Sequence, residues 1–189
     1  GAPVTSTLMG LGALPASSDQ WPGMLGMHGT YEANWAMNKA DLIIAFGARF
    51  DDRVTGRLDA FAPNSRKVHI DIDRSSINKN VRVDLPIIGD VGVALREMIQ
   101  CWKARQHPKP DLTEWWSRID GWRQAACLEF EEKGDAIMPQ RAIRALYEAT
   151  KARAPIITTE VGQHQKWAAQ HFGLEAPNKW LASGGPGTV

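Results

Sequence analysis

Two short glycine-rich segments contain the residues of this chain that are best suited to bind a ligand. The first, residues 23–30, reads Gly-Met-Leu-Gly-Met-His-Gly-Thr. The second, residues 47–56, reads Gly-Ala-Arg-Phe-Asp-Asp-Arg-Val-Thr-Gly and follows the apolar run 42–46. A strand that ends in glycine and then presents Arg-Asp-Asp-Arg offers charge at the carboxyl edge of a parallel sheet, which is where α/β proteins bind nucleotides.

Several of the candidate side chains have a plainer interpretation that the sequence leaves open. His28 is compatible with an ordinary surface histidine. Arg49 is compatible with a solvated turn as well as with a phosphate or ribose contact. Asp71 and Asp90, each near the end of an apolar run, suit either a ribose-binding acid or a helix N-cap. Taken together, strand ends with Gly or Asp at one edge predict a crevice for a nucleotide-bearing cofactor.

The elements that must position these residues alternate between strand and helix. The run 42–46 is continuously apolar, which predicts a strand buried on both faces. This alternation is typical of an α/β fold with a parallel sheet and flanking helices. We expect strands at 4–9, 42–46, 67–72, 85–88 and 154–160. We expect helices at 30–39 (capped by Thr30), 91–103, 112–132 (interrupted or weakened at Gly121) and 140–152 (after Pro139).

A change in composition divides the chain. Residues 106–111 contain two prolines among polar neighbours, which is typical of a linker. We therefore expect one domain over residues 1–105, a linker and helix over 106–135, and the start of a second α/β domain over 136–189. About 50 residues rarely form an independent α/β unit, so we expect a truncated second domain and a longer parent polypeptide.

Composition and the missing motifs narrow the function classes. The net charge of +1 gives no reason to expect nucleic-acid binding, and no apolar run is long enough to predict a membrane span. Cys101 and Cys127 do not form a disulfide framework. No P-loop, zinc-protease motif or nucleophile elbow is present, and Gly10-Leu11-Gly12 lacks the third glycine of a plain NAD site. For Trp115, Trp116 and Trp122 we expect helix packing rather than base stacking.

Several longer sequence motifs indicate one protein family. The chain resembles the catalytic subunit of acetohydroxyacid synthase (acetolactate synthase) over its whole length, with matching words at residues 3–12, 23–34, 47–57, 158–165, 167–170 and 183–185. That family has an N-terminal pyrimidine-binding domain, a central Rossmann-like FAD-binding domain and a C-terminal thiamine diphosphate domain. The resemblance places this chain in the later part of the central domain and the start of the C-terminal one.

The resemblance implies a thiamine-dependent carboligase, a transferase that condenses pyruvate with pyruvate or 2-oxobutyrate in branched-chain amino-acid biosynthesis. The flavin of this family is required but undergoes no net redox change. Two alternatives stay open. One is another thiamine-dependent carboligase such as glyoxylate carboligase, and the other is a non-enzymatic flavin- or nucleotide-binding remnant.

The resemblance also implies the site residues and partners. No catalytic residue falls in this segment, and the Mg²⁺ motif lies outside it, so we expect the segment to be inactive alone. Arg53 and Met27 would face the channel for 2-oxo acid substrates. We expect a homo-oligomer with active sites at subunit interfaces, a possible regulatory small subunit, and a cytoplasmic (bacterial) or plastid or mitochondrial (eukaryotic) location. The implied FAD residues are Thr7, Leu8, Met9, Leu25, Gly26, Met27, His28, Gly47, Arg49, Asp51, Val54, Asp71, Ile72, Gly89 and Asp90; the implied thiamine diphosphate residues are Val161, Gly162, Gln163, His164 and Gly187.

Overall fold

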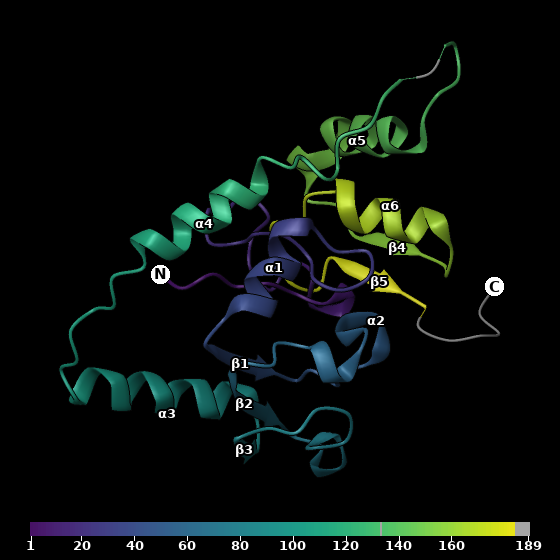
Figure 1. The fold of residues 1–189 in the computed structure, drawn as a ribbon. Helices are drawn as coiled ribbons and strands as arrows, with labels where there is room; N and C mark the ends of the chain where they lie inside the picture. The colour runs from purple at the N-terminus through teal and green to yellow at the C-terminus, as the bar shows by residue number, and fades with distance from the viewer. Residues whose placement is uncertain (133, 184–189) are drawn as a thin grey trace. The chain divides into compact units, whose positions relative to one another are not determined.

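The computed structural model describes residues 1–132 and 134–183, which form two compact units. Unit 1 joins residues 1–34 to the described residues from 117 onward, and unit 2 comprises residues 35–116. Helices α1 (Tyr31–Lys39) and α4 (Thr113–Arg123) run through the two boundaries (Figure 1). None of the helices in the described residues is long and apolar enough to cross a membrane. The predicted domain limits at residues 105 and 136 stay a prediction.

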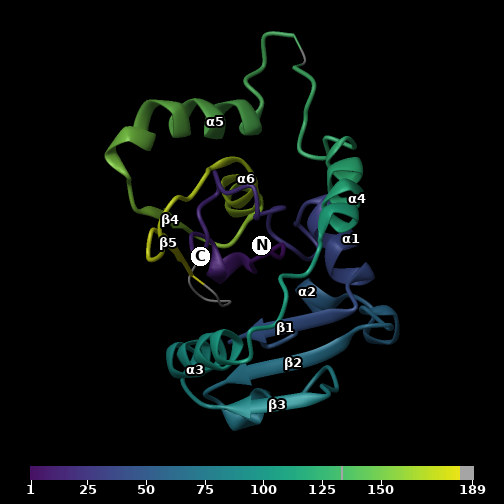
Figure 2. The same ribbon diagram turned by 90° about the vertical axis from the view of Figure 1, so that its left-hand side faces the viewer.

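Unit 2 is built on a three-stranded parallel sheet in the order β1-β2-β3, as Figure 2 shows. The pairing places Phe46 opposite Ile70, and Asp71 opposite Ile88, so the three strands end near one another. The predicted α/β class with a parallel sheet is therefore confirmed. The elements are β1 (Leu42–Phe46), α2 (Asp52–Thr55), β2 (Arg66–Asp71), β3 (Leu85–Ile88), α3 (Val91–Ala104) and 3₁₀ turns at Leu58–Ala60 and Arg74–Ser76.

The prediction that β1 is buried on both faces is wrong. Ile43 and Ala45 are buried, whereas Leu42, Ile44 and Phe46 are 40–49% exposed. The buried pair packs into a cluster with Phe50, Phe61, Ala62 and Val83 on one face of the sheet. Helix α3 contacts β2, while the alternate β1 residues Leu42, Ile44 and Phe46 stay partly exposed.

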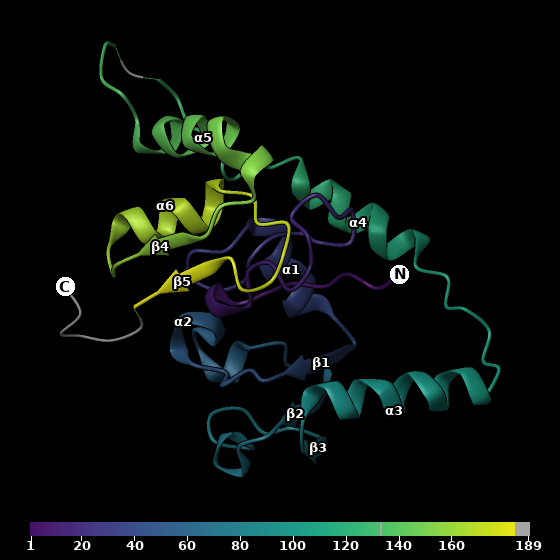
Figure 3. The same cartoon turned by 180° about the vertical axis from the view of Figure 1, so that it is seen from behind.

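Unit 1 contains a second, two-stranded parallel sheet, β4 (Ile157–Thr159) and β5 (Trp180–Ala182), joined through α6 (Gln163–His171). Figure 3 shows β4 and β5 together with α6 and α5 (Pro139–Thr150). Proline at the first position of α5 suits the start of a helix, where an N–H has no intrahelical acceptor. The core of unit 1 comprises Leu11, Met24, Ala168, Ala169, Phe172, Leu174 and Trp180.

Two predicted strands are wrong or too long. Of residues 4–9, Ser6 forms an isolated parallel bridge to Met24, and the chain then enters a 3₁₀ turn at Leu8–Gly10. The predicted strand 154–160 shrinks to β4 because Ala154 adopts a left-handed conformation with φ 46°. In both segments, β-branched residues extend beyond the few residues that pair with another strand or bridge partner.

The predicted helix 112–132 ends early, at Arg123. Ala126 has φ 44°, a left-handed conformation that interrupts the helix. The next residues bind elsewhere in unit 1: the Sγ of Cys127 accepts a hydrogen bond from Tyr31 N, and Arg144 donates to Leu128 O. Tertiary contacts therefore override the helical spacing. The other predicted helices are confirmed to within a few residues of their ends.

Candidate functional site

Thr30 closes the first glycine-rich loop. Its Oγ1 donates to Pro22 O (2.7 Å) and accepts from Ala33 N (3.2 Å), and its backbone N donates to Met24 O (2.8 Å). The predicted N-cap of α1 at Thr30 is thus confirmed. One buried side chain both starts the helix and ties the two ends of the loop together.

Two side chains from outside the loop fix its backbone. Asn34 Oδ1 accepts from Gly26 N (2.8 Å), and Asn34 Nδ2 donates to Gly26 O (2.9 Å). Gln170 Nε2, on α6, donates to His28 O (2.9 Å). Between these two attachments the Met27 side chain is 61% exposed. The loop therefore presents an apolar thioether from a well-held backbone.

Gly29 is required by close packing in this loop. A Cβ at this position would collide with Met24 O and with the backbone of Leu25. Backbone atoms cannot move aside as the end of a flexible side chain can, so no other residue fits here without shifting the loop.

The structure brings a second predicted flavin segment, residues 7–9, beside this loop within unit 1. Leu25 N donates to Ser6 O (3.0 Å), and Thr5 Oγ1 donates to Gly23 O (2.6 Å). These bonds run on both sides of the Ser6–Met24 bridge. Of the segment's side chains, Met9 is 65% exposed, while Thr7 and Leu8 are half-buried.

The predicted flavin residues of unit 2 follow the carboxyl ends of its sheet. Gly47 N donates to Ile70 O (2.8 Å), and Gly89 N donates to Asp71 O (3.0 Å). The backbone thus continues the ladder by one residue on each side of β2. The expectation that these strand ends share one edge is confirmed.

Asp71 and Asp90 turn out to have different roles. Asp90 Oδ1 accepts from Val93 N (2.9 Å), so Asp90 is the N-cap of α3. Asp71 caps no helix; its Oδ1 accepts from Asp73 N (2.8 Å) in the turn after β2. Its Oδ2 lies 3.6 Å from the Nε2 of His69. His69 is fully buried, and neither of its ring nitrogens has a hydrogen-bond partner within residues 1–132 and 134–183. Ile72, which follows, is exposed.

The arginines of the second glycine-rich segment face solvent. Arg49 pairs with Asp51 at 3.2 Å, and Arg53 lies 3.6 Å from Asp52. The side chains of Arg49 and Arg53 are 77% and 67% exposed, so these pairs are weak and leave the guanidinium groups accessible to an anion. Val54, also predicted to line the flavin, is half-buried in α2.

The predicted thiamine diphosphate segment forms the start of α6. Gly162 precedes the helix, and a Cβ there would meet the His164 ring at 2.8 Å, so the imidazole folds back over the glycine. Val161 is 44% exposed. The buried Thr159 Oγ1, at the end of β4, has no hydrogen-bond partner among the described residues. The first backbone N–H groups of a helix, beside a glycine, suit a phosphate. The predicted residue Gly187 lies outside the described residues.

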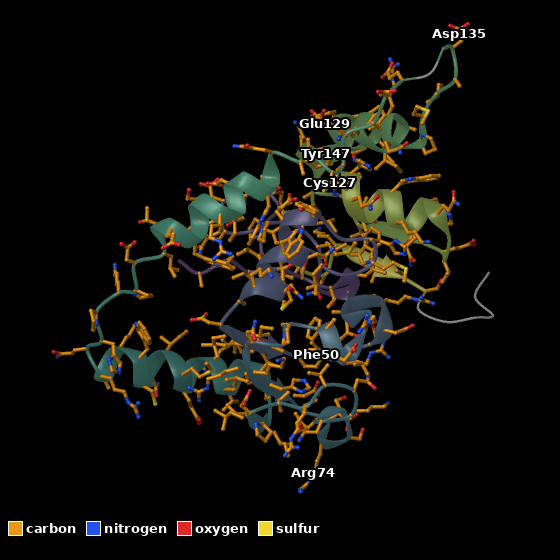
Figure 4. The ribbon with its side chains drawn as sticks, in the orientation of Figure 1. Phe50, Arg74, Cys127, Glu129, Asp135 and Tyr147 are labelled. Carbon is orange, nitrogen blue, oxygen red and sulfur yellow. The ribbon has the colours of Figure 1, made fainter. Side chains whose placement is uncertain are left out.

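Cys127, labelled in Figure 4, is not activated as a nucleophile. Burial raises the pKa of its thiol, and the neighbouring Glu32 carboxylate raises it further, against the hydrogen bond from Tyr31 N. The thiol therefore stays protonated at neutral pH. Over residues 1–132 and 134–183, no three His, Cys, Asp or Glu side chains come together as they would to hold a metal ion.

Sequence reasoning missed the residues that hold the site. Asn34 and Gln170 fell within matching words but were given no role. The available signal was position: each is a polar residue that directly follows a buried alanine, Ala33 or Ala169, on an amphipathic helix. Buried His69 could be suspected only from its place between the apolar residues Val68 and Ile70 in a predicted strand.

Comparison with known proteins identifies the class. Residues 1–98 match the family model described as the central domain of thiamine pyrophosphate enzymes, and the chain belongs to this family. The match covers the first glycine-rich loop and all three strands of the unit 2 sheet.

Within that class the chain is similar to acetolactate synthases over nearly its whole length. It is 46% identical to the acetolactate synthase large subunit of Haemophilus influenzae and 45% identical to the isozyme 3 large subunit of Escherichia coli, with 99% of this chain and 33% of each relative covered. It is 47% identical to the chloroplastic acetolactate synthase of Arabidopsis thaliana, covering 100% of this chain and 28% of that protein. The resemblance read from the sequence is confirmed, and the chain spans about a third of the length of these relatives.

Proposed function

We propose that this chain is part of an acetolactate synthase large subunit, which condenses two pyruvates, or pyruvate and 2-oxobutyrate, in branched-chain amino-acid biosynthesis. The observation that carries the proposal is the 45–47% identity to acetolactate synthases from end to end of the chain. The match includes both glycine-rich segments and the start of α6.

Thiamine diphosphate fits the start of α6. Val161, Gly162, Gln163 and His164 would hold it, with backbone N–H groups toward the diphosphate; Gly187 is proposed as a further contact. Two features support the fit: the close approach of His164 to Gly162, and the Thr159 hydroxyl beside the segment, which has no partner in the part of the chain that the structure describes. When bound, this cofactor supplies the electron sink that lets a 2-oxo acid lose carbon dioxide and add to a second one. Mg²⁺ would be held by residues outside this chain.

FAD is the proposed ligand of two groups of residues, which are described separately for each unit. Exposed apolar side chains at Met9 and Met27 in unit 1, and at Ile72 in unit 2, would pack against its apolar surface. Arg49 would pair with an anionic oxygen, and Asp71 would accept from a hydroxyl. The full proposed set is Thr7, Leu8, Met9, Leu25, Gly26, Met27 and His28 in unit 1, and Gly47, Arg49, Asp51, Val54, Asp71, Ile72, Gly89 and Asp90 in unit 2. The proposed function of FAD in this protein is structural, and the flavin undergoes no net redox change.

Arg53 and Met27 would line the substrate channel. The exposed Arg53 guanidinium matches the planar carboxylate of a 2-oxo acid, because its N–H groups can form two parallel hydrogen bonds. Met27 would supply an adaptable apolar wall. A homo-oligomer with interface active sites, a regulatory small subunit, and a cytoplasmic or organellar location are further parts of this proposal.

The protein expressed from the complete reading frame that contains this chain provides the test. It is assayed with pyruvate, thiamine diphosphate, Mg²⁺ and FAD, and then with 2-oxobutyrate or glyoxylate as the second substrate. Acetolactate and acetohydroxybutyrate are the expected products. Condensation of glyoxylate alone, or no condensation at all, would overturn the proposal. The 189-residue chain assayed by itself should form no acetolactate.

Arg53→Ala in the complete protein tests the substrate contact. Loss of a charged carboxylate partner is expected to raise the KM for pyruvate by about tenfold or more. Arg57→Ala is the matched control, because Arg57 is an exposed arginine four residues away that pairs with Asp59 at 2.6 Å. Equal effects of the two substitutions would exclude the proposed role of Arg53.

A further inference from the structure

Helix α6 connects the predicted thiamine diphosphate segment of unit 1 to one of its two predicted flavin segments. Its first residues, Gln163 and His164, belong to the predicted thiamine diphosphate segment. Near its other end, Gln170 donates a hydrogen bond to His28 O (2.9 Å) in the Met27–His28 loop. Gln163 and Gln170 are seven residues apart, which places them on one side of the helix and about 10 Å apart along its axis.

The helix is anchored so that it moves as one body. Ala168 and Ala169 are 5% and 3% exposed and belong to the core of unit 1, together with Phe172 just beyond the helix end. Close-packed interiors transmit displacements rather than absorb them. A shift imposed at the first turn of α6 therefore reaches Gln170.

The loop at the other end is attached to both α1 and α6. Asn34 holds the Gly26 peptide, and Gly29 N donates to Gly26 O (2.9 Å), but the His28 carbonyl is held from α6. The amide of Gln170 therefore favours one orientation of the His28–Gly29 peptide group, next to the exposed Met27.

We propose that Gln170 is a positioning residue that couples the Met27–His28 loop to the Gly162–His164 segment through α6, so that thiamine diphosphate and flavin each strengthen the binding of the other. The coupling rests on the proposed function, since that proposal places flavin at the loop and thiamine diphosphate at the helix start. Linkage requires the effect to be reciprocal.

Flavin affinity is measured by fluorescence titration of the complete protein, with and without thiamine diphosphate and Mg²⁺. In the wild-type protein thiamine diphosphate should tighten flavin binding by about fivefold or more. Gln170→Met keeps the side-chain length but removes the donor, and should reduce this factor toward one. Gln100→Met, on the exposed side of α3, is the matched control and should leave the factor unchanged.

Two further measurements keep the outcome decisive. Should Gln170→Met fail to fold, Gln170→Glu, which faces the His28 carbonyl with a carboxylate, should lose the coupling in the same way. In the wild-type protein, thiamine diphosphate alone should slow hydrogen exchange across residues 26–29. An active wild-type enzyme with no coupling, or one in which Gln170→Met retains it, would overturn the inference and leave the proposed function intact. A wild-type protein that forms no acetolactate would instead overturn the proposed function.

Discussion

The side chain of Asn34 pairs with the peptide group of Gly26 through two hydrogen bonds, one from Gly26 N at 2.8 Å and one to Gly26 O at 2.9 Å. The amide thereby does for this loop what a neighbouring strand does in a sheet. Because Asn34 lies on α1, which begins directly after the loop, residues 23–34 encode both the glycine turn and the device that fixes it.

Asn34→Ala should lower the free energy of unfolding. Two hydrogen bonds are lost and the buried Gly26 N–H loses its partner, while Gly26 O still accepts from Gly29 N, so a cost of roughly 1–2 kcal/mol is expected. Urea unfolding of the chain measures the change. Asn38→Ala is the control on the same helix, because Asn38 makes one exposed bond to Ala60 O at 3.1 Å. A larger loss for Asn38→Ala than for Asn34→Ala would refute the role of this pair.

Gly29→Ala and Gly121→Ala should act in opposite directions. The added methyl at Gly29 would collide with the backbone of Met24 and Leu25 and should cost about 2 kcal/mol or more. At Gly121, in the last turn of α4, a Cβ would meet nothing within 4 Å, and alanine should stabilise the helix by roughly 0.5–1 kcal/mol. Thermal unfolding of both variants provides the test. A lowered midpoint for Gly29→Ala alone indicates strain at Gly29, whereas a lowered midpoint for both variants would mean that alanine destabilises this chain at either glycine.

The sequence predicted best where local signals and the global fold agree. The strand at 42–46 and the helix at 91–103 were found because apolar patterning, a following glycine or aspartate, and the α/β alternation all agreed. The shared edge at which the unit 2 strands end could then be predicted, because parallel strands bring their carboxyl ends together. The exposed face of β1 could not be predicted, because five apolar residues in a row look the same whether a second layer covers them or not.

The long-range contacts of the site could not be predicted from the sequence. Gln170 and His28 are 142 positions apart in the sequence, and no local sequence pattern predicts their hydrogen bond. The early end of α4 has the same origin, since contacts of Cys127 and Leu128 with distant residues outweigh helical spacing. Most residues proposed to contact cofactors came from the family resemblance, and Arg49, Asp71 and Asp90 were also indicated by their place after predicted strands. The residues that hold the loops in place could be found only in the structure.

Thr159→Val and Thr158→Val test the unpartnered hydroxyl at the end of β4. A buried hydroxyl without a partner is a cost in the folded state, so replacing it by a methyl group should raise the free energy of unfolding by about 1 kcal/mol. Thr158 is exposed on the opposite face of the strand, and its replacement should change stability by less than about 0.5 kcal/mol. Destabilisation of the Thr159→Val chain in urea would mean that the hydroxyl has a partner in solution.

His171 should make the stability of the chain depend on pH. Burial lowers the pKa of His171 below its ordinary value of 6.5, and the nearby Arg144 guanidinium, which donates to His171 Nδ1 at 3.4 Å, lowers it further. The unfolded chain therefore binds a proton at this site more readily than the folded chain. Stability from this group is fully present above about pH 6.5 and is lost as the pH falls from there toward the folded pKa. His171→Gln keeps an acceptor for Arg144 without the titration, so urea unfolding at about pH 7.5 and about pH 5.5 should differ less for this variant than for the wild-type chain. An equal or larger difference in the variant would show that other groups set the acid sensitivity.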